Sequence, residues 1–431
     1  MRWWKQLKRN REKGKVNNKS MKELFDFDHT PDRRNTRSVK WDEMPDVLPL
    51  WVADMDFATA PCVQQAVMKR AQHPCYGYTL VPAEYYQSIV SWFWERHNWR
   101  VRAEEILYTI GVIPAIAAIL KAECQVGDNV VILSPVYNAF YALVRNAGCS
   151  MIDVPLKVKS EKLKVDNEAS RNQMTYSIDW EALEAALVQA KTTVLLMSNP
   201  HNPVGRVWTE EELLRIGQLC IKHHVLLISD EIHNELTAPG IRYVPMGRVA
   251  AEAKQVLSGL RYCVCTSPSK SFNIAGLQNA NIITPDTELR RKIDRAININ
   301  ETCDVNPFGV EAVMAAYNEG AAWLDEVCRY IWDNYAFACA YLNKELPALK
   351  IADLQATYLM WVDYSALIPS KNSVEVCKCL QDEAKVWLAA GSIYGPATGA
   401  HHLRINLATS RALLTEALQR FATWMKANAE Q

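Results

Sequence analysis

The sequence lacks a net charge, a membrane-length apolar run and a secretory signal. Its 48 lysines and arginines match 48 aspartates and glutamates over 431 residues. Nothing in this balance indicates a nucleic acid or an acidic partner. The N-terminus has no apolar core followed by a cleavage site, and no apolar run reaches the length of a bilayer span. We therefore expect neither a nucleic-acid-binding nor a membrane protein.

The twelve cysteines include no Cys-x-x-Cys pair. Several, such as Cys220, Cys263 and Cys265, stand inside apolar runs, where a reduced thiol packs as a small hydrophobe. Cys377 and Cys379 are too close for the usual zinc spacing, and no His-x-x-His follows. We expect no metal site, and the many thiols favour a cytoplasmic location.

The first twenty residues are strongly basic. Eight lysines and arginines against Glu12 give a net charge of +7. We expect residues 1–20 to form a disordered basic tail, from a start codon upstream of Met21, in preference to an arm that binds nucleic acid.

The rest of the chain has the size and pattern of a two-domain α/β enzyme. Apolar residues make up 49% and charged residues 22%, which supplies a large core. Apolar strand-like runs alternate with helical segments as far as Pro285, which predicts a parallel sheet with right-handed crossovers. The residues Thr209 and Glu212 form a capping box that begins one of these helices. Near Asn306 the pattern changes to long helices and two later strands, which predicts a smaller second domain.

Lys270 is the first candidate for chemistry. It stands between Ser269 and Ser271, just after the strand-like run 262–266. A lysine held at such a place can form a Schiff base with a carbonyl group.

Two other polar residues also follow apolar strands. Asp230 ends the buried run 224–229, and Asn202 lies in a turn rich in proline after the run 192–198. The carboxyl ends of strands are where α/β proteins place their sites. We therefore expect Asp230, Asn202 and Lys270 to meet at one sheet edge.

These three segments together resemble the pyridoxal-phosphate (PLP) enzymes of fold type I, the class I/II aminotransferase superfamily. Four phrases narrow the resemblance to the MalY/PatB-type cystathionine β-lyases, or C–S lyases, and they cover residues 32–42, 50–57, 76–79 and 229–233. The resemblance extends from about Phe25 to the C-terminal helix.

The resemblance implies a fold with two domains. The expected large domain, residues 61–305, has a mostly parallel seven-stranded sheet and binds PLP. The expected smaller α/β domain is formed by both chain ends, from residues 306–431 with the N-terminal segment 21–60.

The resemblance also assigns the residues around the PLP ring. Lys270 carries the cofactor as a Schiff base, and Asp230 pairs with the pyridine nitrogen, which must be protonated to act as an electron sink. Asn202 and His233 lie beside the phenolate oxygen, where many aminotransferases have tyrosine instead of His233. Tyr137 stacks on the ring and is the third expected catalytic residue.

The phosphate is expected at a helix start, where backbone N–H groups and the helix dipole favour an anion. That start is Gly111-Val112-Ile113, ahead of Pro114. Ser267 adds a hydroxyl. Position 278 is glutamine, where many aminotransferases have an arginine. The resemblance implies that Tyr78 of a neighbouring subunit helps, so a homodimer is expected.

The α-carboxylate of an amino-acid substrate requires a guanidinium group. Arg404 matches the family's arginine, and Asn202 is expected to assist it. With the freed amine of Lys270 as the base, a thiolate leaving group at Cβ yields thiol, pyruvate and ammonia. We expect this β-elimination from cystathionine or another L-cysteine S-conjugate. The alternatives are an aminotransferase and a regulatory protein that binds PLP without turnover.

Overall fold

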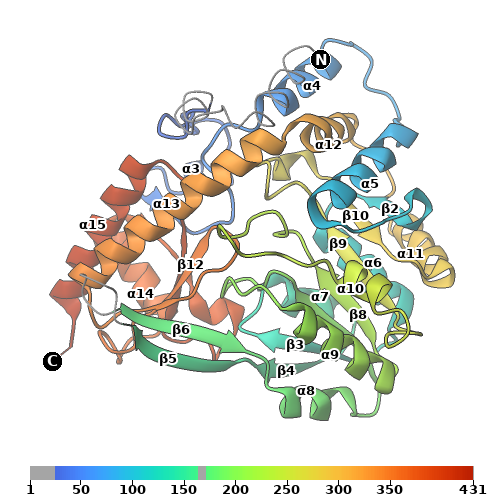
Figure 1. Cartoon of the computed structure of the whole chain (residues 1–431). Helices are drawn as coiled ribbons and strands as arrows, with labels where there is room; N and C mark the ends of the chain where they lie inside the picture. Colours follow the sequence, from blue (N-terminus) through green and yellow to red (C-terminus); the bar gives the residue numbers. More distant parts are fainter. Residues whose placement is uncertain (1–24, 164–170, 431) are drawn as a thin grey trace.

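The structure is a computed structural model that describes residues 25–163 and 171–430. The tail expected at residues 1–20 lies outside the described residues. The helices are α3 (Val39–Asp42), α4 (Pro61–Ala71), α5 (Ala83–His97), α6 (Val112–Glu123), α7 (Ala139–Asn146), α8 (Trp180–Leu187), α9 (Glu210–Lys222), α10 (Met246–Glu252), α11 (Thr287–Ile299), α12 (Pro307–Glu319), α13 (Ala321–Glu345), α14 (Ser373–Cys379) and α15 (Arg411–Asn428). Figure 1 shows their arrangement.

A seven-stranded sheet forms the centre of the larger part of the molecule. Its order is β2 (Ile106–Thr109), β10 (Ala280–Ile283), β9 (Tyr262–Thr266), β8 (Leu226–Asp230), β7 (Thr192–Ser198), β3 (Asn129–Ser134) and β4 (Ser150–Pro155). The strands from β9 to β4 run parallel, and β10 is antiparallel to both of its neighbours. The expected mostly parallel seven-stranded sheet is confirmed.

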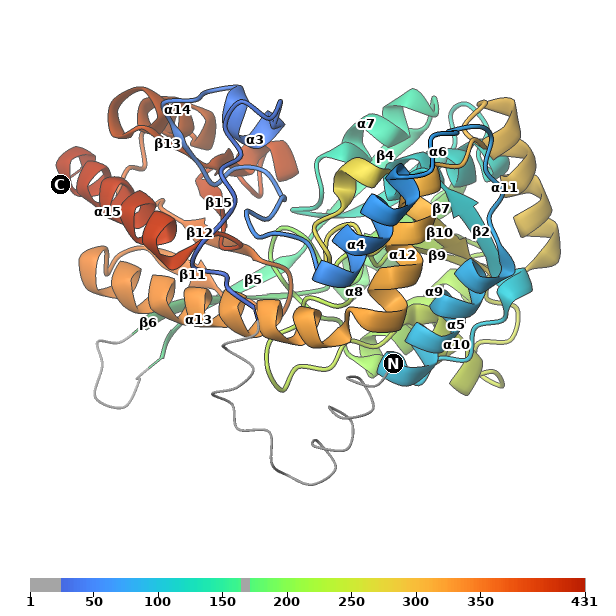
Figure 2. The same ribbon diagram turned by 90° about the horizontal axis from the view of Figure 1, so that it is seen from above.

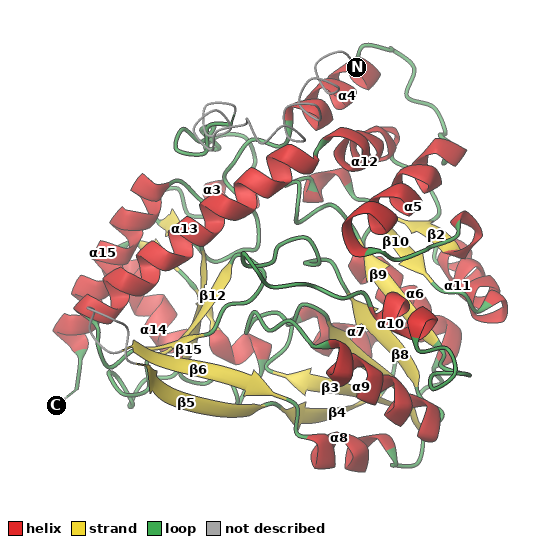
Figure 3. Ribbon diagram, viewed as in Figure 1, coloured by secondary structure: helices red, strands yellow, loops and turns green. Residues whose placement is uncertain are grey.

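Helices cover both faces of this sheet (Figure 3). In β3, Val130 and Ile132 belong to an apolar cluster that includes residues of α6, α7 and α11, whereas Val131 and Leu133 belong to another that includes residues of α5, α8, α9, α10 and α12. A parallel sheet buried on both faces needs strands that are apolar on both sides, as these are. The same continuous runs made the strands recognisable in the sequence.

Local signals set several helix starts. Thr209 Oγ1 accepts from the Glu212 N–H at 3.2 Å, and the Glu212 carboxylate accepts from the Thr209 N–H at 2.8 Å, so the predicted capping box is confirmed. Asn306 caps α12 in one direction only: its Oδ1 accepts from the N–H groups of Phe308 and Gly309 at 3.0 and 3.4 Å, and Pro307 is the first residue of the helix.

A second sheet lies at the other end of the molecule. Its order is β14 (Ala389–Ala390), β15 (His402–Asn406), β12 (Leu359–Asp363), β11 (Lys350–Ala352), β6 (Arg171–Ser177) and β5 (Lys157–Leu163). The hairpin β5–β6 comes from within the segment 61–305, yet it joins the C-terminal strands. The domain boundaries given above stay a prediction.

The N-terminal segment lies against the C-terminal part of the chain. The short strand β1 (Leu48–Pro49) pairs in parallel with β13 (Val386–Trp387). In Figure 2, this blue segment runs beside the red elements α14 and β15, while the long helix α13 extends along both parts. The two chain ends therefore build the smaller part together, as expected.

None of the helices within 25–163 and 171–430 is long and apolar enough to cross a membrane. Over the same ranges, no three His, Cys, Asp or Glu side chains are grouped to hold a metal ion.

Candidate active site

A pocket opens at the carboxyl ends of the parallel strands. Its wall comes from residues at or just after the carboxyl ends of β2, β3, β7, β8 and β9, and the last three are the strands predicted from the runs 192–198, 224–229 and 262–266. The predicted site residues in this wall are Gly111, Val112, Ile113, Tyr137, Asn202, Asp230, His233 and Lys270. The fold therefore brings together groups that are up to 159 residues apart in the sequence, from Gly111 to Lys270.

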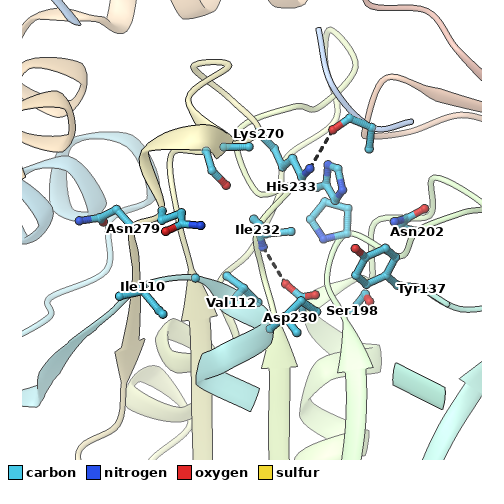
Figure 4. A pocket seen from close by; sticks show the side chains of 17 residues that line it. Ile110, Val112, Tyr137, Ser198, Asn202, Asp230, Ile232, His233, Lys270 and Asn279 are labelled. Carbon is cyan, nitrogen blue, oxygen red and sulfur yellow. Dashed lines mark hydrogen bonds between the residues drawn. The ribbon is translucent and has the colours of Figure 1, made fainter. Parts of the chain in front are cut away.

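Asp230 forms the floor of the pocket (Figure 4). It is the last residue of β8 and is 5% exposed. Burial raises the pKa of its carboxyl to about 7, and the neighbouring Glu231 adds to the rise, although the Ile232 N–H donates to Oδ1 at 3.2 Å. A cationic partner inside the pocket would therefore stabilise the ionised form of Asp230.

Glu231 faces away from the pocket into a network of its own. Its carboxylate accepts hydrogen bonds from the Ser229 hydroxyl at 2.7 Å, the Met246 N–H at 3.1 Å and the Tyr243 hydroxyl. Burial raises its pKa to about 7 as well. Glu231 thus anchors the loop after β8 and leaves Asp230 as the carboxylate that lines the pocket.

Lys270 enters the pocket from the opposite end, as Figure 4 shows. Its Nζ donates to the backbone carbonyl of Ala53 at 2.8 Å. Burial lowers the pKa of the amine, while the carboxylates of Asp54 and Asp230 oppose that shift. A lowered pKa increases the fraction of neutral amine, which is the form that acts as a nucleophile or base.

His233 is a neutral imidazole in the pocket wall. Burial, followed by the charges of Lys270 and Arg404, lowers its pKa to about 3. Its Nδ1 is buried and has no hydrogen-bond partner among the described residues. Such an atom costs free energy unless a bound group or water satisfies it.

Tyr137 and Asn202 lie on one side of the pocket, and Ile110 and Asn279 lie on the other (Figure 4). Tyr137 follows β3, and burial raises the pKa of its phenol. The ring is thus an uncharged aromatic surface beside the pocket.

The start of α6 supplies a second kind of group. Gly111 is the N-cap, and Val112 and Ile113 are the first two residues of the helix. The N–H groups of the first turn have no partner within the helix, and the dipole makes this end positive. The expected segment does begin a helix, but Pro114 is the third residue of that helix and not its first, because the helix already begins at Val112.

Arg404 lies beside the pocket and is 4% exposed. Its Nη1 donates to Asn202 Oδ1 at 3.2 Å, its Nη2 donates to the Trp51 carbonyl at 3.0 Å, and its guanidinium lies 4.5 Å from the centre of the Tyr394 ring. In β15, the neighbouring Leu403 and Ile405 enter the apolar core. The guanidinium is held at the border between β15 and the pocket.

Two predicted residues are placed elsewhere. The Ser267 hydroxyl donates to the Asn279 carbonyl at 2.5 Å and accepts from the Ser269 N–H, so it is already engaged, and Ser269 lines the pocket in its place. Tyr78 is fully exposed and lines a separate hollow with Tyr76, Thr79 and Cys303. Within a single chain, Tyr78 does not reach the pocket wall.

The sequence reading missed several residues of the wall. Ala53, Ser198, Gln278 and Asn279 all line the pocket. Three of them belong to sequence features noted above: Ala53 lies in the phrase 50–57, Ser198 ends the run 192–198, and Gln278 stands where many aminotransferases have an arginine. None of these features indicated a contact with the pocket. Ser198 has a buried hydroxyl with no partner among the described residues.

The chain is similar to known proteins along most of its length. The family model for aminotransferase class I and II matches residues 45–421. Cystathionine β-lyase PatB of Bacillus subtilis is 36% identical over 402 residues, which cover 92% of this chain and 98% of that protein. Protein MalY of Escherichia coli is 30% identical over 399 residues, covering 91% and 96%. The crystal structure of cystalysin from Treponema denticola, which contains PLP, matches with a TM-score of 0.84 at 29% identity, covering 94% of this chain and 99% of that one. The chain therefore belongs to the class I and II aminotransferase family.

Proposed function

We propose that this protein is a PLP-dependent carbon–sulfur lyase. It cleaves the Cβ–S bond of L-cysteine thioethers such as cystathionine and, with one water, yields a thiol, pyruvate and ammonia. The observation that carries the proposal is the convergence of the Lys270 amine and the buried Asp230 carboxylate in one pocket, with Arg404 at its border. The names of the relatives PatB and cystalysin support the same reaction class and the same cofactor.

The residues present fit PLP. Two buried polar atoms in the wall, His233 Nδ1 and Ser198 Oγ, have no partner among the described residues and need one. A buried carboxylate, a helix start and an aromatic ring surround the same space, and these match the pyridine nitrogen, the phosphate and the ring of PLP. Asp230, the N–H groups at Val112 and Ile113, and Tyr137 would hold these three parts.

Bound PLP supplies an electron sink for the charge released when the substrate loses its Cα proton. Asp230 would hold the protonated pyridine nitrogen of PLP, because a cationic partner stabilises the carboxylate that burial otherwise disfavours. His233, being neutral, offers a hydrogen bond without a competing charge.

Lys270 is the base. Burial lowers its pKa, so the free amine is available to take the proton from the substrate's Cα. The hydrogen bond to the Ala53 carbonyl holds the nitrogen in place at 2.8 Å. Once the Cα proton has gone, the Cβ–S bond breaks and the sulfur leaves as a thiolate.

Arg404 and Asn202 bind the α-carboxylate of the substrate. The guanidinium is fixed by Asn202 and by the Trp51 carbonyl, so it is ready to pair with a carboxylate at little cost in entropy. Because every α-amino acid carries an α-carboxylate, Arg404 and Asn202 select amino acids as a class. Other contacts must distinguish one thioether from another.

An aminotransferase is the second candidate. It would use the same amine and the same carboxylate, and it differs in returning a proton to the cofactor in place of expelling a β substituent. The residues His233 and Gln278 favour the lyase, because many aminotransferases have tyrosine and arginine at these positions.

The active unit is a homodimer in this proposal. Tyr78 and Tyr76 are exposed aromatic side chains around a hollow, where a second copy would bring Tyr78 to the neighbouring pocket. None of the twelve cysteines, all of which lie within the described residues, forms a disulfide bond, which suits a reducing compartment, and we propose the cytoplasm.

A panel of L-cysteine S-conjugates, incubated with the purified holoenzyme, tests the proposed activity. Thiol and pyruvate should appear in equal amounts from conjugates with a good leaving group. The S-to-CH₂ analogue of each conjugate is the matched control, since it binds by the same carboxylate and has no sulfur to expel. Release of pyruvate without thiol, or no release from any conjugate, would refute the lyase.

A further inference from the structure

Residues 51–57 form a segment that crosses the edge of the pocket, and we call it the active-site strap. Each backbone carbonyl from residue 51 to residue 55 accepts a hydrogen bond from a side chain elsewhere in the chain, at 2.7–3.1 Å. The donors, in order, are Arg404, Asn406, Lys270, Asn406 with Lys40, and Arg33 with Asn273. A segment without regular secondary structure is thus fixed at each of its first five carbonyls.

Two of these donors belong to the proposed active site. Lys270 Nζ donates to the Ala53 carbonyl at 2.8 Å, and Arg404 Nη2 donates to the Trp51 carbonyl at 3.0 Å. The proposed base, Lys270, and the proposed carboxylate-binding group, Arg404, are therefore both held by hydrogen bonds to the same short stretch of backbone. A shift of the strap would move both groups relative to the pocket.

A buried cluster of charges fixes the strap from its other side. The Asp56 carboxylate accepts from Lys40 Nζ at 2.8 Å, from Trp41 Nε1 at 2.8 Å and from Arg33 Nη1 at 3.3 Å. The side chains of Lys40 and Asp56 are 0% and 1% exposed. Arg33 also pairs with Asp54 at 2.6 Å. Two cations and two carboxylates thus meet between the strap and residues 33–41.

A buried ion pair is a costly way to stabilise a fold, because desolvation of both charges offsets much of their attraction. Such a pair does, however, restrict geometry, because each hydrogen bond of Lys40 and Asp56 has a preferred direction and so fixes the position of the group that it joins. Lys40 donates both to the Asp56 carboxylate and to the Asp54 carbonyl, at 2.8 and 2.9 Å, and so locks side chain and backbone together. This arrangement is expected of residues whose role is to fix the position of the active-site strap.

We propose that Lys40 and Asp56 are positioning residues for the reaction, which fix the strap so that the Ala53 and Trp51 carbonyls hold Lys270 and Arg404. The inference rests on the proposed function in one respect, namely that Lys270 takes a proton from the substrate's Cα. With one N–H directed at Ala53, the lone pair of the amine has a defined direction. After the proton is taken, the same carbonyl stabilises the ammonium.

Two of the sequence segments that resemble the family contain the residues of this cluster and the strap. The first, residues 32–42, contains Arg33, Lys40 and Trp41, and the second, residues 50–57, contains the strap. In the first phrase, the Asp42 carboxylate accepts from the N–H groups of Asn35 and Ser38 at 2.8 and 2.9 Å, which shapes the loop that presents Lys40.

Three variants of the holoenzyme test the proposal. Lys40→Met removes the buried cation at similar volume, and Asp56→Asn removes the carboxylate charge at nearly the same shape. Lys350→Met is the matched control, because Lys350 also pairs with an aspartate, Asp363, at 2.9 Å, and does not line the pocket.

The first readout is amide hydrogen exchange of the peptide that covers the strap. The Asp54 and Asp56 N–H groups donate to the carbonyls of Val52 and Ala408, each at 2.9 Å, so loosening the strap exposes them. Exchange in this peptide should rise at least several-fold in Lys40→Met and Asp56→Asn and stay unchanged in Lys350→Met. Cofactor content should stay near that of the unmodified protein.

The second readout is the kinetic isotope effect with an amino-acid substrate that carries deuterium at Cα. A misplaced base slows proton transfer itself, so kcat should fall by about 10²-fold and the isotope effect on kcat/KM should rise. KM should rise too, through Arg404. A merely structural role lowers the fraction of active enzyme and leaves the isotope effect unchanged.

The proposal is overturned if strap exchange rises while kcat, KM and the isotope effect stay as they were, or if activity falls with an unchanged isotope effect. Should the charge variants not fold, Trp41→Phe removes only one hydrogen bond to Asp56 and should give the same changes at smaller size. Cα deprotonation is common to elimination and transamination. The test therefore stands even if thiol release fails, so the two proposals fail separately.

Discussion

Arg404 Nη1 donates to Asn202 Oδ1 at 3.2 Å, although the two residues are 202 positions apart in the chain. Asn202 comes from the turn after β7 in the large sheet, and Arg404 comes from β15 in the six-stranded sheet. The contact joins the two sheets at the pocket. It fixes the position of Arg404, which is expected to bind the substrate carboxylate, relative to Asn202, which is expected beside the cofactor.

Replacement of Arg404 by alanine should raise KM for every amino-acid substrate by a common factor. The loss of a charged hydrogen-bonded pair costs about 1.5–3 kcal/mol, or roughly 10- to 150-fold. Cofactor content should be unchanged, because Arg404 does not line the pocket. Steady-state kinetics with several substrates measure this. Loss of PLP at an unchanged KM would assign Arg404 to the cofactor or to the fold.

Lys270→Ala should abolish the visible absorbance of the bound cofactor and nearly all turnover. No other amine lines the pocket within the described residues, so nothing replaces the covalent link. Lys222→Ala, on the exposed surface of α9, is the control and should behave as the unmodified protein. If Lys270→Ala keeps both the absorbance and the activity, the site has been assigned wrongly.

Acid should destabilise the protein partly through His201. Burial lowers the pKa of this wholly buried imidazole from 6.5 to about 4. Between these values the folded protein binds fewer protons than the unfolded chain. The contribution of His201 is therefore complete above pH 6.5 and is lost as the pH falls toward 4.

The matched variant is His201→Gln, which keeps a donor for the Pro135 carbonyl. Between pH 7 and pH 4, the free energy of unfolding should shift in favour of the variant by up to about 3 kcal/mol. Asp230 and Glu231 titrate with the opposite sign, but they are common to both proteins and cancel. Denaturant unfolding at several pH values measures the difference, and a constant difference would contradict a depressed pKa.

Mixed dimers should reveal whether Tyr78 acts in the neighbouring subunit. In a hybrid of Lys270→Ala and Tyr78→Phe chains, one pocket would have both residues intact if Tyr78 acts across a two-fold axis. Refolding an equal mixture should then restore about a quarter of the unmodified activity, since half of the dimers are hybrids with one intact site. Activity no higher than the mean of the two parents would contradict the arrangement.

Much of the site could be predicted because it depends on strand ends. Asp230, Asn202 and Lys270 each follow an apolar run, and the parallel sheet brings such ends to one edge. The start of α6 could be predicted from Gly111 and Pro114, because proline is tolerated in the first turn of a helix, where its missing N–H has no partner to lose.

What the sequence could not supply were contacts between side chains and distant backbone. The Ala53 carbonyl that accepts from Lys270 belongs to a residue without functional chemistry, and no local pattern marks it. The engagement of the Ser267 hydroxyl with Asn279 also depends on tertiary structure. The hairpin β5–β6 was missed because its charged, exposed strand resembles a loop in composition.

The most direct test of the central claim is incubation of the purified holoenzyme with L-cystathionine in the absence of any keto acid. Elimination needs no amino acceptor, whereas transamination consumes one molecule of keto acid per turnover. The proposed lyase predicts homocysteine, pyruvate and ammonia in equal amounts, at a rate that added keto acid does not increase. Activity that appears only when a keto acid is supplied, with no free thiol formed, would contradict the lyase and establish an aminotransferase.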